Sequence, residues 1–306
     1  MSGQDRREEL RAQFESTKAN FEATSARIEQ RAGRNLFVAI GSALIFAGLF
    51  LGSLFFIEQL FILFLIGLLS IASVELAAAF RLAGRRVPRV GVVIGGLIIV
   101  LGAYFWGAQG MLLGLFAGSI LLTLWRLLEG LVPKWEVPPR TLLRDVFSGL
   151  FSLVYIPFLG SYTVLMLQGE RGAWWVFAMV LVVVSVDVGA YAAGVTLGKH
   201  KMTPRISPNK TWEGFAGAAL TAMLSGTVIA LLALDQPWWV GTVLGAIVLF
   251  TATGGDLTES LIKRNLGVKD MSTWIPGHGG FLDRLDSLLP SAVGAYALAL
   301  GLGVLG

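Results

Sequence analysis

Residues 174–198 read WWVFAMVLVVVSVDVGAYAAGVTLG, a stretch in which Asp187 is the one charged side chain. An α-helix needs about 20 predominantly apolar residues to cross the hydrocarbon core of a bilayer. The stretch meets that length, so it predicts a helix that spans a membrane.

The rest of the chain repeats this pattern in eight further apolar runs, which cover residues 36–57, 60–80, 90–107, 110–128, 146–167, 214–234, 238–254 and 288–305. Hydrophobic residues make up 55% of the chain and charged residues 14%, a composition too apolar for a soluble domain. We therefore predict an all-α polytopic membrane protein with about nine transmembrane helices.

Basic residues set the predicted orientation. When the amino terminus is placed in the cytoplasm, all of the 24 Lys and Arg residues except Arg171 fall on the cytoplasmic side. Cytoplasmic loops of membrane proteins carry an excess of Lys and Arg. We therefore expect a multi-pass protein of the cell inner membrane, with a cytoplasmic amino terminus and its functional site on the cytoplasmic side.

The chain divides into three parts. Residues 1–34 carry charges of both signs around an apolar helical face, which predicts a cytoplasmic amphipathic segment. Residues 35–144 hold the N-terminal transmembrane helices, and residues 145–306 form a C-terminal transmembrane catalytic region with a cytoplasmic loop at 255–287. In the N-terminal part glycine recurs every fourth residue, a spacing that lets helices pack closely in lipid, at Gly91, Gly95, Gly110, Gly114 and Gly118.

Composition also limits the possible metal sites. The chain has no cysteine, and its two histidines are His200 and His278. A disulfide framework and a thiolate metal site are therefore excluded, and any metal must rest mainly on oxygen. The net charge of +4 gives no ground to expect nucleic acid as a partner.

Charged residues collect between Gly254 and Leu288, beside the predicted membrane surface. If Asp256 opens a helix or continues the preceding one, Ser260 and Lys263 share its face. Asp283 and Asp286, three residues apart, would share another face. Two carboxylates from different helices with Lys and Arg nearby suit Mg²⁺ and phosphate. A solvated or salt-bridged pair is the plainer interpretation.

Two acidic residues lie inside predicted spans, where a charge is costly and functional by default. Asp187 shares a helical face with Tyr191 and Gly194, which favours a functional role. Glu75 has two open interpretations, a functional role or an ion pair with Arg81 or Arg85.

The stretch Ser207-Pro208-Asn209-Lys210-Thr211 leads into a predicted span. Its hydroxyls and Lys210 suit phosphate. A helix start capped by Thr211 or Ser207, with Glu213 in the first turn, accounts for the same residues without a ligand.

Two blocks together resemble one family. Ser260-x-x-Lys263-Arg264-x4-Lys269-Asp270, followed by Ile275-Pro276-x-His278-Gly279-Gly280-Phe281-x-Asp283-Arg284-Leu285-Asp286, resembles the signature of the phosphatidate cytidylyltransferases, or CDP-diacylglycerol synthases. A similar upstream block runs Asp187-x3-Tyr191-x2-Gly194, Gly198-Lys199 and Ser207-Pro208-x-Lys210-Thr211-x-Glu213-Gly214. It departs from the family pattern at Val188, Val195 and Asn209. The resemblance covers roughly residues 145–300.

The resemblance implies transfer of CMP from CTP to phosphatidate, which gives CDP-diacylglycerol and pyrophosphate. It implies Mg²⁺, with the number of metal ions, one or two, and a monovalent second ion left open. It also implies a homodimer in contact with membrane lipids. Asp256 and Asp283 would bind metal.

The remaining site residues follow from the same resemblance. Phosphates would be neutralised by Lys263, Arg264, Lys269 and Arg284, and oriented by Asp270, His278 and Asp286. Substrate would be bound by Asp187, Tyr191, Ser207, Pro208, Lys210, Thr211, Glu213 and Ser260. A CTP-dependent lipid kinase, a transporter or channel, and an inactive scaffold remain as alternatives.

Overall fold

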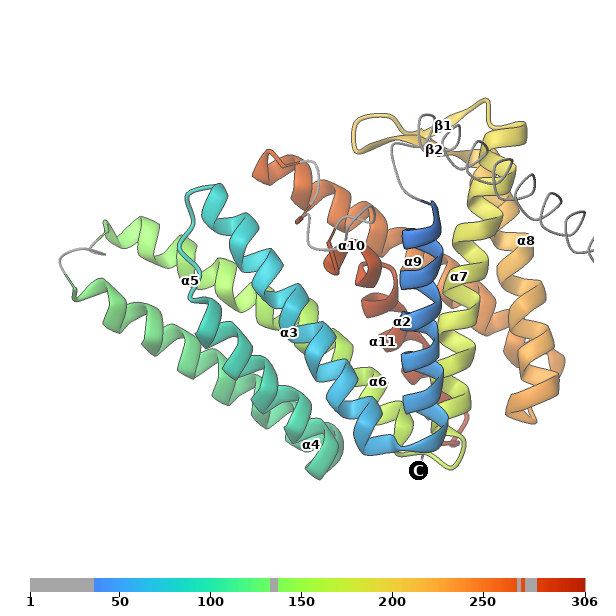
Figure 1. Ribbon diagram of the computed structural model, residues 1–306, viewed down its shortest axis with the longest axis horizontal. Helices are drawn as coiled ribbons and strands as arrows, with labels where there is room; N and C mark the ends of the chain where they lie inside the picture. The colour runs from blue at the N-terminus through green and yellow to red at the C-terminus, as the bar shows by residue number, and fades with distance from the viewer. Residues whose placement is uncertain (1–35, 133–136, 269–270, 273–279, 306) are drawn as a thin grey trace, which may run out of the picture.

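The computed structural model describes residues 36–132, 137–268, 271–272 and 280–305 (Figure 1). The predicted amphipathic segment 1–34 lies outside these residues. Within them, six helices are long and apolar enough to cross a membrane, at Glu58–Leu82, Arg89–Gly130, Pro139–Leu167, Gly172–Leu197, Trp212–Leu234 and Trp238–Leu266. The protein is therefore a multi-pass, predominantly α-helical membrane protein.

The elements follow the chain in this order: α2 (Leu36–Phe56), α3 (Glu58–Leu82), α4 (Arg89–Gly130), α5 (Pro139–Leu153), a π-helical turn (Val154–Phe158), α6 (Leu159–Leu167), α7 (Gly172–Leu197), β1 (Lys201–Thr203), β2 (Ser207–Thr211), α8 (Trp212–Ile229), a second π-helical turn (Ala230–Leu234), α9 (Trp238–Leu266), α10 (Leu282–Leu285) and α11 (Leu288–Gly301). The π-helical turn between α5 and α6 contains Pro157, which lacks the N–H that a regular helix would use.

Helix α4 folds back on itself. Trp106 and Gly107 leave the helical conformation, and Gly107 has a φ of 61°, which glycine adopts without strain. The two legs then run antiparallel in close contact (Figure 1). A Cβ atom at Gly114 would lie 2.8 Å from the carbonyl oxygen of Ile98 in the other leg. The predicted role of these glycines in close helix packing is confirmed.

A two-stranded antiparallel hairpin joins α7 to α8, with Lys201 opposite Thr211 and Thr203 opposite Ser207. It stands above the ends of the helices in Figure 1. No strand is predicted for this segment from the sequence. The hairpin is short and polar, and so it lacks the alternation of apolar residues that indicates a strand.

Helix α9 extends further than predicted. The predicted span ended at residue 254, and residues 255–287 were expected as a loop, but α9 continues to Leu266 and ends at Gly267, whose φ is 71°. The interpretation in which Asp256 continues the preceding helix is therefore the correct one. Ser260 and Lys263 consequently share the face of Asp256.

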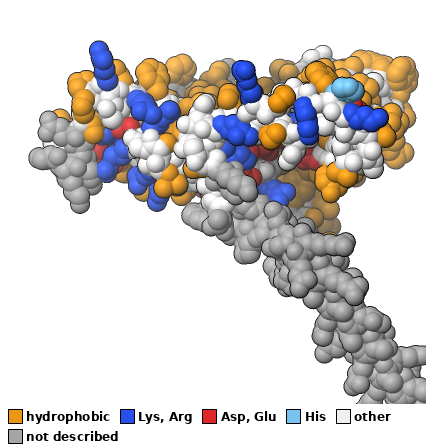
Figure 2. All heavy atoms as spheres, turned by 90° about the horizontal axis from the view of Figure 1, so that it is seen from above, with side chains coloured by type: hydrophobic (Ala, Val, Ile, Leu, Met, Phe, Trp, Pro, Cys, Tyr) orange, Lys and Arg blue, Asp and Glu red, His pale blue; other side chains and the backbone are white. Residues whose placement is uncertain are grey.

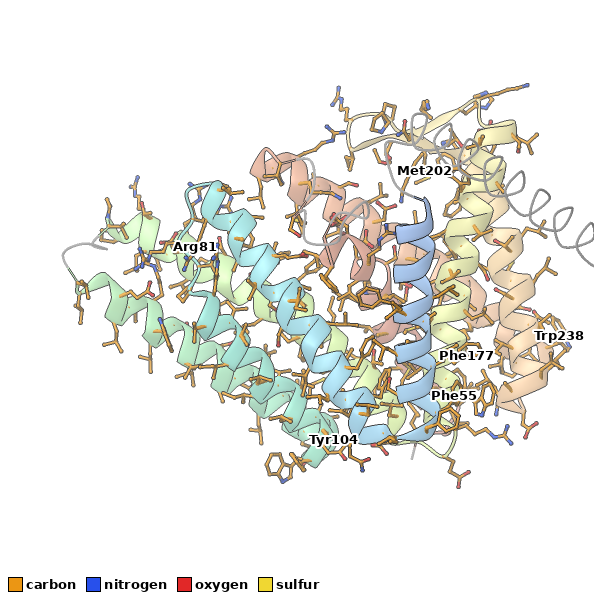
Figure 3. The ribbon with its side chains drawn as sticks, in the orientation of Figure 1. Phe55, Arg81, Tyr104, Phe177, Met202 and Trp238 are labelled. Atoms are coloured by element: carbon orange, nitrogen blue, oxygen red, sulfur yellow. The ribbon has the colours of Figure 1, made fainter. Side chains whose placement is uncertain are left out.

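Polar and aromatic residues separate along the bundle. Figure 2 looks onto the face that lies uppermost in Figure 1, where Lys and Arg are spread with acidic side chains among them and hydrophobic side chains form the rim. Figure 3 places Arg81 and Met202 toward that end, and Phe55, Tyr104, Phe177 and Trp238 toward the other. Aromatic residues are typical of the interface between a membrane and water.

Candidate active site

A polar pocket of about 290 Å³ lies between α7, the hairpin, α8 and α9. Six of the predicted site residues line it: Asp187, Tyr191, Ser207, Lys210, Thr211 and Asp256. Pro208 and Glu213 are absent from its lining. The pocket therefore joins α7, the hairpin and α9, although these residues span some 70 positions of sequence.

An ion pair crosses this pocket. The Nζ atom of Lys210 on β2 lies 2.7 Å from Oδ2 of Asp256 on α9, and both side chains are partly exposed. Ser260, one turn further along α9, donates a hydrogen bond of 3.4 Å to the other oxygen of Asp256. The partial exposure leaves Lys210 and Asp256 accessible to a ligand.

The hairpin is fastened to α8 by its own polar residues. Thr211 caps α8, because its hydroxyl oxygen accepts a hydrogen bond of 3.1 Å from the N–H of Gly214. Glu213 accepts hydrogen bonds from the backbone N–H groups of Lys199 and His200 and lies 2.6 Å from His200 Nδ1. Glu213 thus holds the base of the hairpin.

A second polar cluster lies two turns along α9 from Asp256. The Nζ atom of Lys263 lies 2.8 Å from Oε2 of Glu259 and 2.9 Å from Oδ1 of Asp283. Glu259 is buried, and sequence reasoning left it out of the site. Glu259 lies four residues before Lys263, a spacing at which Glu and Lys pair on a helix, and this spacing could have indicated its place in the site.

The start of α10 fixes the carboxylate of Asp283. The N–H of Gly280 donates a hydrogen bond of 2.7 Å to Oδ2. Burial acts to raise the pKa of Asp283, but its interactions with Glu259, Lys263 and the Gly280 N–H outweigh burial and hold the pKa below its usual range. Asp283 is consequently ionised at neutral pH.

Asp286 has the opposite character. Burial, followed by the negative charge of Asp256, raises its pKa to about 6. The backbone N–H of Ser287 donates a hydrogen bond of 2.6 Å to its carboxylate. At mildly acidic pH Asp283 therefore stays ionised, while Asp286 takes up a proton.

Glu75 of α3 anchors the segment that leads into α10. Its carboxylate accepts hydrogen bonds from the N–H groups of Phe281, at 3.1 Å, and Leu282, at 2.9 Å, and from the hydroxyl of Ser272. Of the two interpretations of Glu75, the structure favours a role at the site. Arg81 and Arg85 instead donate to Val87 and Ser148.

The other predicted residues lie around these clusters. Arg264 donates a hydrogen bond of 2.7 Å to the carbonyl of Ile206, which ties the end of α9 to the hairpin. Arg284 lines a separate apolar cavity. Lys269, Asp270 and His278 lie outside the described residues.

The carboxylates of the polar pocket suit a metal ion that is also coordinated by the phosphates of a bound substrate. In the part of the chain that the structure describes, no three Asp, Glu or His side chains are grouped closely enough to form a metal cage. Asp187 and Asp256 nevertheless present oxygen donors to the same pocket. Mg²⁺ is usually held by one or two carboxylates together with water and substrate phosphates. These residues fit that mode of binding.

Fold and site together define a membrane protein with a polar, lysine- and aspartate-lined pocket at one end of its helices. The sequence profile of the Cytidylyltransferase family matches residues 37–301, and the chain belongs to this family.

Its relatives carry a more specific name. It is 37% identical over 276 residues to the phosphatidate cytidylyltransferase of Mycobacterium leprae (strain TN), with 88% of each chain covered. It is 36% identical to that of Mycobacterium tuberculosis (strain ATCC 25618 / H37Rv), over 87% of this chain and 83% of the relative. The phosphatidate cytidylyltransferase of Brucella suis biovar 1 (strain 1330) is 36% identical over 61% of this chain and 68% of its own.

Proposed function

We propose that the protein transfers CMP from CTP to phosphatidate and thereby makes CDP-diacylglycerol for phospholipid synthesis. A phosphate oxygen of phosphatidate attacks the α-phosphorus of CTP and forms the new P–O bond. The bond between the α-phosphorus and the bridging oxygen to the β-phosphate breaks, and pyrophosphate leaves. No covalent enzyme intermediate is needed.

One observation carries the proposal: the two motif blocks, far apart in sequence, meet in one site. Lys210 of the upstream block pairs with Asp256, and Asp256 accepts a hydrogen bond from Ser260 of the signature block. Arg264 of the signature block also donates a hydrogen bond to the carbonyl of Ile206 in the hairpin. Transfer between two anions depends above all on neutralising charge and fixing position. The arrangement supplies cations and carboxylates from opposing elements.

We assign the residues roles on this basis. Lys210 and Lys263 neutralise phosphates on the two sides of the site, with Arg264, Lys269 and Arg284 in support. Asp256, with Asp187 beside it in the polar pocket, would hold Mg²⁺, which would polarise phosphate oxygens and offset their charge. Asp283, the second metal ligand that the family resemblance implies, lies outside the lining of that pocket, and we assign it to holding Lys263 in place. Ser207, Thr211 and Tyr191 contact the nucleotide. Glu75 acts through the backbone of Phe281 and Leu282, and so it is a positioning residue.

The membrane arrangement that we propose has nine spans, a cytoplasmic amino terminus and a cytoplasmic active site in the cell inner membrane. The fold-back of α4 supports the count, because its two legs correspond to two predicted spans. The orientation is supported by the basic face in Figure 2, which lies at the end of the bundle where Figure 1 places the hairpin. CTP is cytosolic and would meet the lipid headgroup there. A homodimer is proposed from the family resemblance.

The test measures CDP-diacylglycerol and pyrophosphate made by purified protein from phosphatidate, CTP and Mg²⁺. Asp283→Asn should abolish lipid-dependent product. Asp235→Asn is the matched control, because Asp235 is an exposed aspartate that pairs with Arg171 away from the site. Release of CDP with a lipid alcohol would favour the kinase alternative. CTP binding without turnover would favour a scaffold.

A further inference from the structure

A second cavity, of about 450 Å³, lies between α2, α3, α6, α7 and the α10–α11 segment. It is larger than the polar pocket, and its volume falls within the range typical of ligand sites. The cavity is open on one side, so it can admit a ligand from outside the helix bundle.

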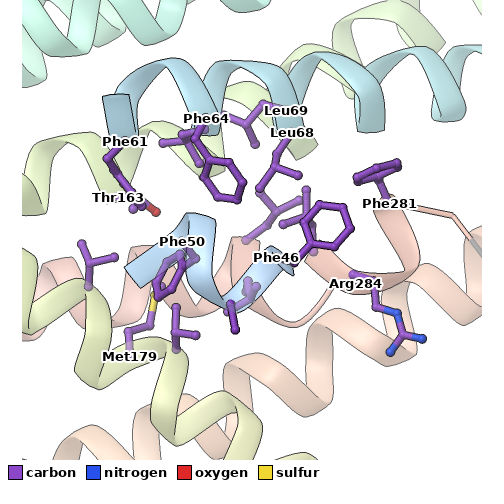
Figure 4. Close-up of a pocket in the computed structure, with 18 residues that line it drawn as sticks. Phe46, Phe50, Phe61, Phe64, Leu68, Leu69, Thr163, Met179, Phe281 and Arg284 are labelled. Carbon is purple, nitrogen blue, oxygen red and sulfur yellow. The ribbon is translucent and has the colours of Figure 1, made fainter. Parts of the chain in front are cut away.

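The lining of the cavity is almost wholly apolar. Phenyl rings from α2 and α3 and aliphatic side chains from α6, α7 and α11 form its walls, and Thr163 and Arg284 are its polar members. Figure 4 shows Arg284 and Phe281 at one end and Phe61 and Thr163 toward the other. The cavity thus carries positive charge at one end of an apolar interior.

The long axis of the cavity follows α3. Its lining residues on that helix run from Leu69 to Phe61, eight positions that correspond to about 12 Å of helix length. Phe61, which is 2% exposed, lies toward the end of the cavity away from Arg284 (Figure 4). On the α2 side, exposed Ala47 and Phe46, which is 36% exposed, border the cavity and leave lateral access from lipid. The dimensions and access suit a hydrocarbon chain.

The segment 283–289 separates this cavity from the polar site. Arg284, Leu285 and Leu288 face the apolar cavity, whereas Ser287 lines the polar pocket. Asp283, next to Arg284, is held by Lys263. A phosphate beside Arg284 would therefore lie at the border of the reactive cluster, with any attached chain directed into the cavity.

We propose that this cavity binds an acyl chain of the phosphatidate substrate, with the lipid phosphate at Arg284. The inference rests on the proposed function and adds the place of the lipid and the origin of chain-length selection. A chain that enters from the bilayer is already out of water, so the cavity would select among chains by how well they pack against its walls.

The first test narrows the cavity from its α2 wall. Ala47→Trp places an indole in the space that the chain would fill. The ratio of kcat/KM for dioleoyl-phosphatidate to that for dioctanoyl-phosphatidate should fall about tenfold, because the indole takes up space that the long chain needs more than the short one does. Leu49→Trp is the matched control: Leu49 is 53% exposed and lies outside the lining of the cavity, so its ratio should stay at the wild-type value.

A second test uses the unaltered protein and does not depend on a variant that folds. Phosphatidate with a diazirine at the end of one chain should label peptides that contain residues 61–69 and 160–163. Unlabelled phosphatidate should compete, and phosphatidylcholine should not. Labelling spread over lipid-facing residues such as Leu113, without competition, would overturn the proposal, as would equal ratios in both tryptophan variants. If the wild type turned over neither lipid, the proposed function itself would fail.

Discussion

Glu75→Ala should loosen the segment that carries Asp283, because it removes the acceptor of three hydrogen bonds. The N–H groups of Phe281 and Leu282 and the hydroxyl of Ser272 converge on the Glu75 carboxylate, which is 1% exposed. A hydrogen bond to a charged group contributes about 1.5–3 kcal/mol. Water at the membrane surface would form some of these hydrogen bonds in place of Glu75. We therefore expect the ordered form of the segment to lose about 2–4 kcal/mol of stability.

Glu75→Gln should have a smaller effect of the same kind. The amide keeps one acceptor oxygen but directs an NH₂ group at an N–H donor, so one bond is replaced by a repulsive contact. If the ordered form of the segment loses about 2 kcal/mol of stability, the ratio of ordered to disordered molecules falls roughly 30-fold. We therefore expect kcat/KM to fall by about tenfold or more.

The assay combines product formation with hydrogen exchange of the amides of residues 280–288. Both Glu75 variants should exchange faster there, whereas the exchange of α4 should be unaltered. Glu129→Gln is the control, since Glu129 is a partly buried glutamate that binds Arg86 at 2.9 Å and Trp125 at 3.2 Å, away from this segment. Unchanged exchange at 280–288 together with full activity in Glu75→Gln would refute the reasoning.

Three further outcomes are expected. Gly114→Ala should destabilise the protein by about 1–3 kcal/mol in thermal unfolding, because the new Cβ atom meets the backbone of the other α4 leg. Gly67→Ala is the control, since Gly67 has open space around it, and this change should be neutral or stabilising. Lys263→Met removes the cation that pairs with Asp283 and hydrogen-bonds buried Glu259, so it should cost about 3 kcal/mol of stability and abolish product. Lys201→Met in the exposed hairpin should do neither. Because the pKa of Asp286 is raised to about 6, the folded protein binds this proton before the unfolded chain does, so lowering the pH from 7 to 5 should add about 1 kcal/mol of stability, a gain that Asp286→Asn should remove.

Much of the fold could be predicted because membrane spans follow from local composition. The fold-back of α4 at Trp106 and Gly107 falls at the end of the predicted span 90–107, just before the span 110–128, and the glycine spacing indicated the close approach of the two legs. The hairpin at 201–211 was missed, because its strands are short and polar. The extension of α9 was left open, since Gly254 and Gly255 weaken a helix in sequence terms but are tolerated where tertiary packing supports it.

For the site, sequence spacing predicted which residues share a helix, while contacts between helices needed the structure. Asp256, Ser260 and Lys263 do share a face of α9. Nothing in their spacing indicates that Lys210 pairs with Asp256, or that Glu75 reaches residues more than 200 positions away. Such pairs depend on how helices pack, which a single sequence does not encode in any local pattern.

The N-terminal helices, which carry no motif of their own, take part in the site through α2 and α3. Helix α3 supplies the buried carboxylate that holds the signature segment, and with α2 it forms one wall of the apolar cavity. Helix α4, by contrast, lines neither the polar pocket nor that cavity, and its glycines serve close packing. The charged cluster on α9 is therefore completed from three directions: the hairpin brings Lys210, α10 brings Asp283, and α3 fixes the position of α10. A chain shortened to residues 145–306 would keep every motif residue and still lack the anchor that orders Asp283.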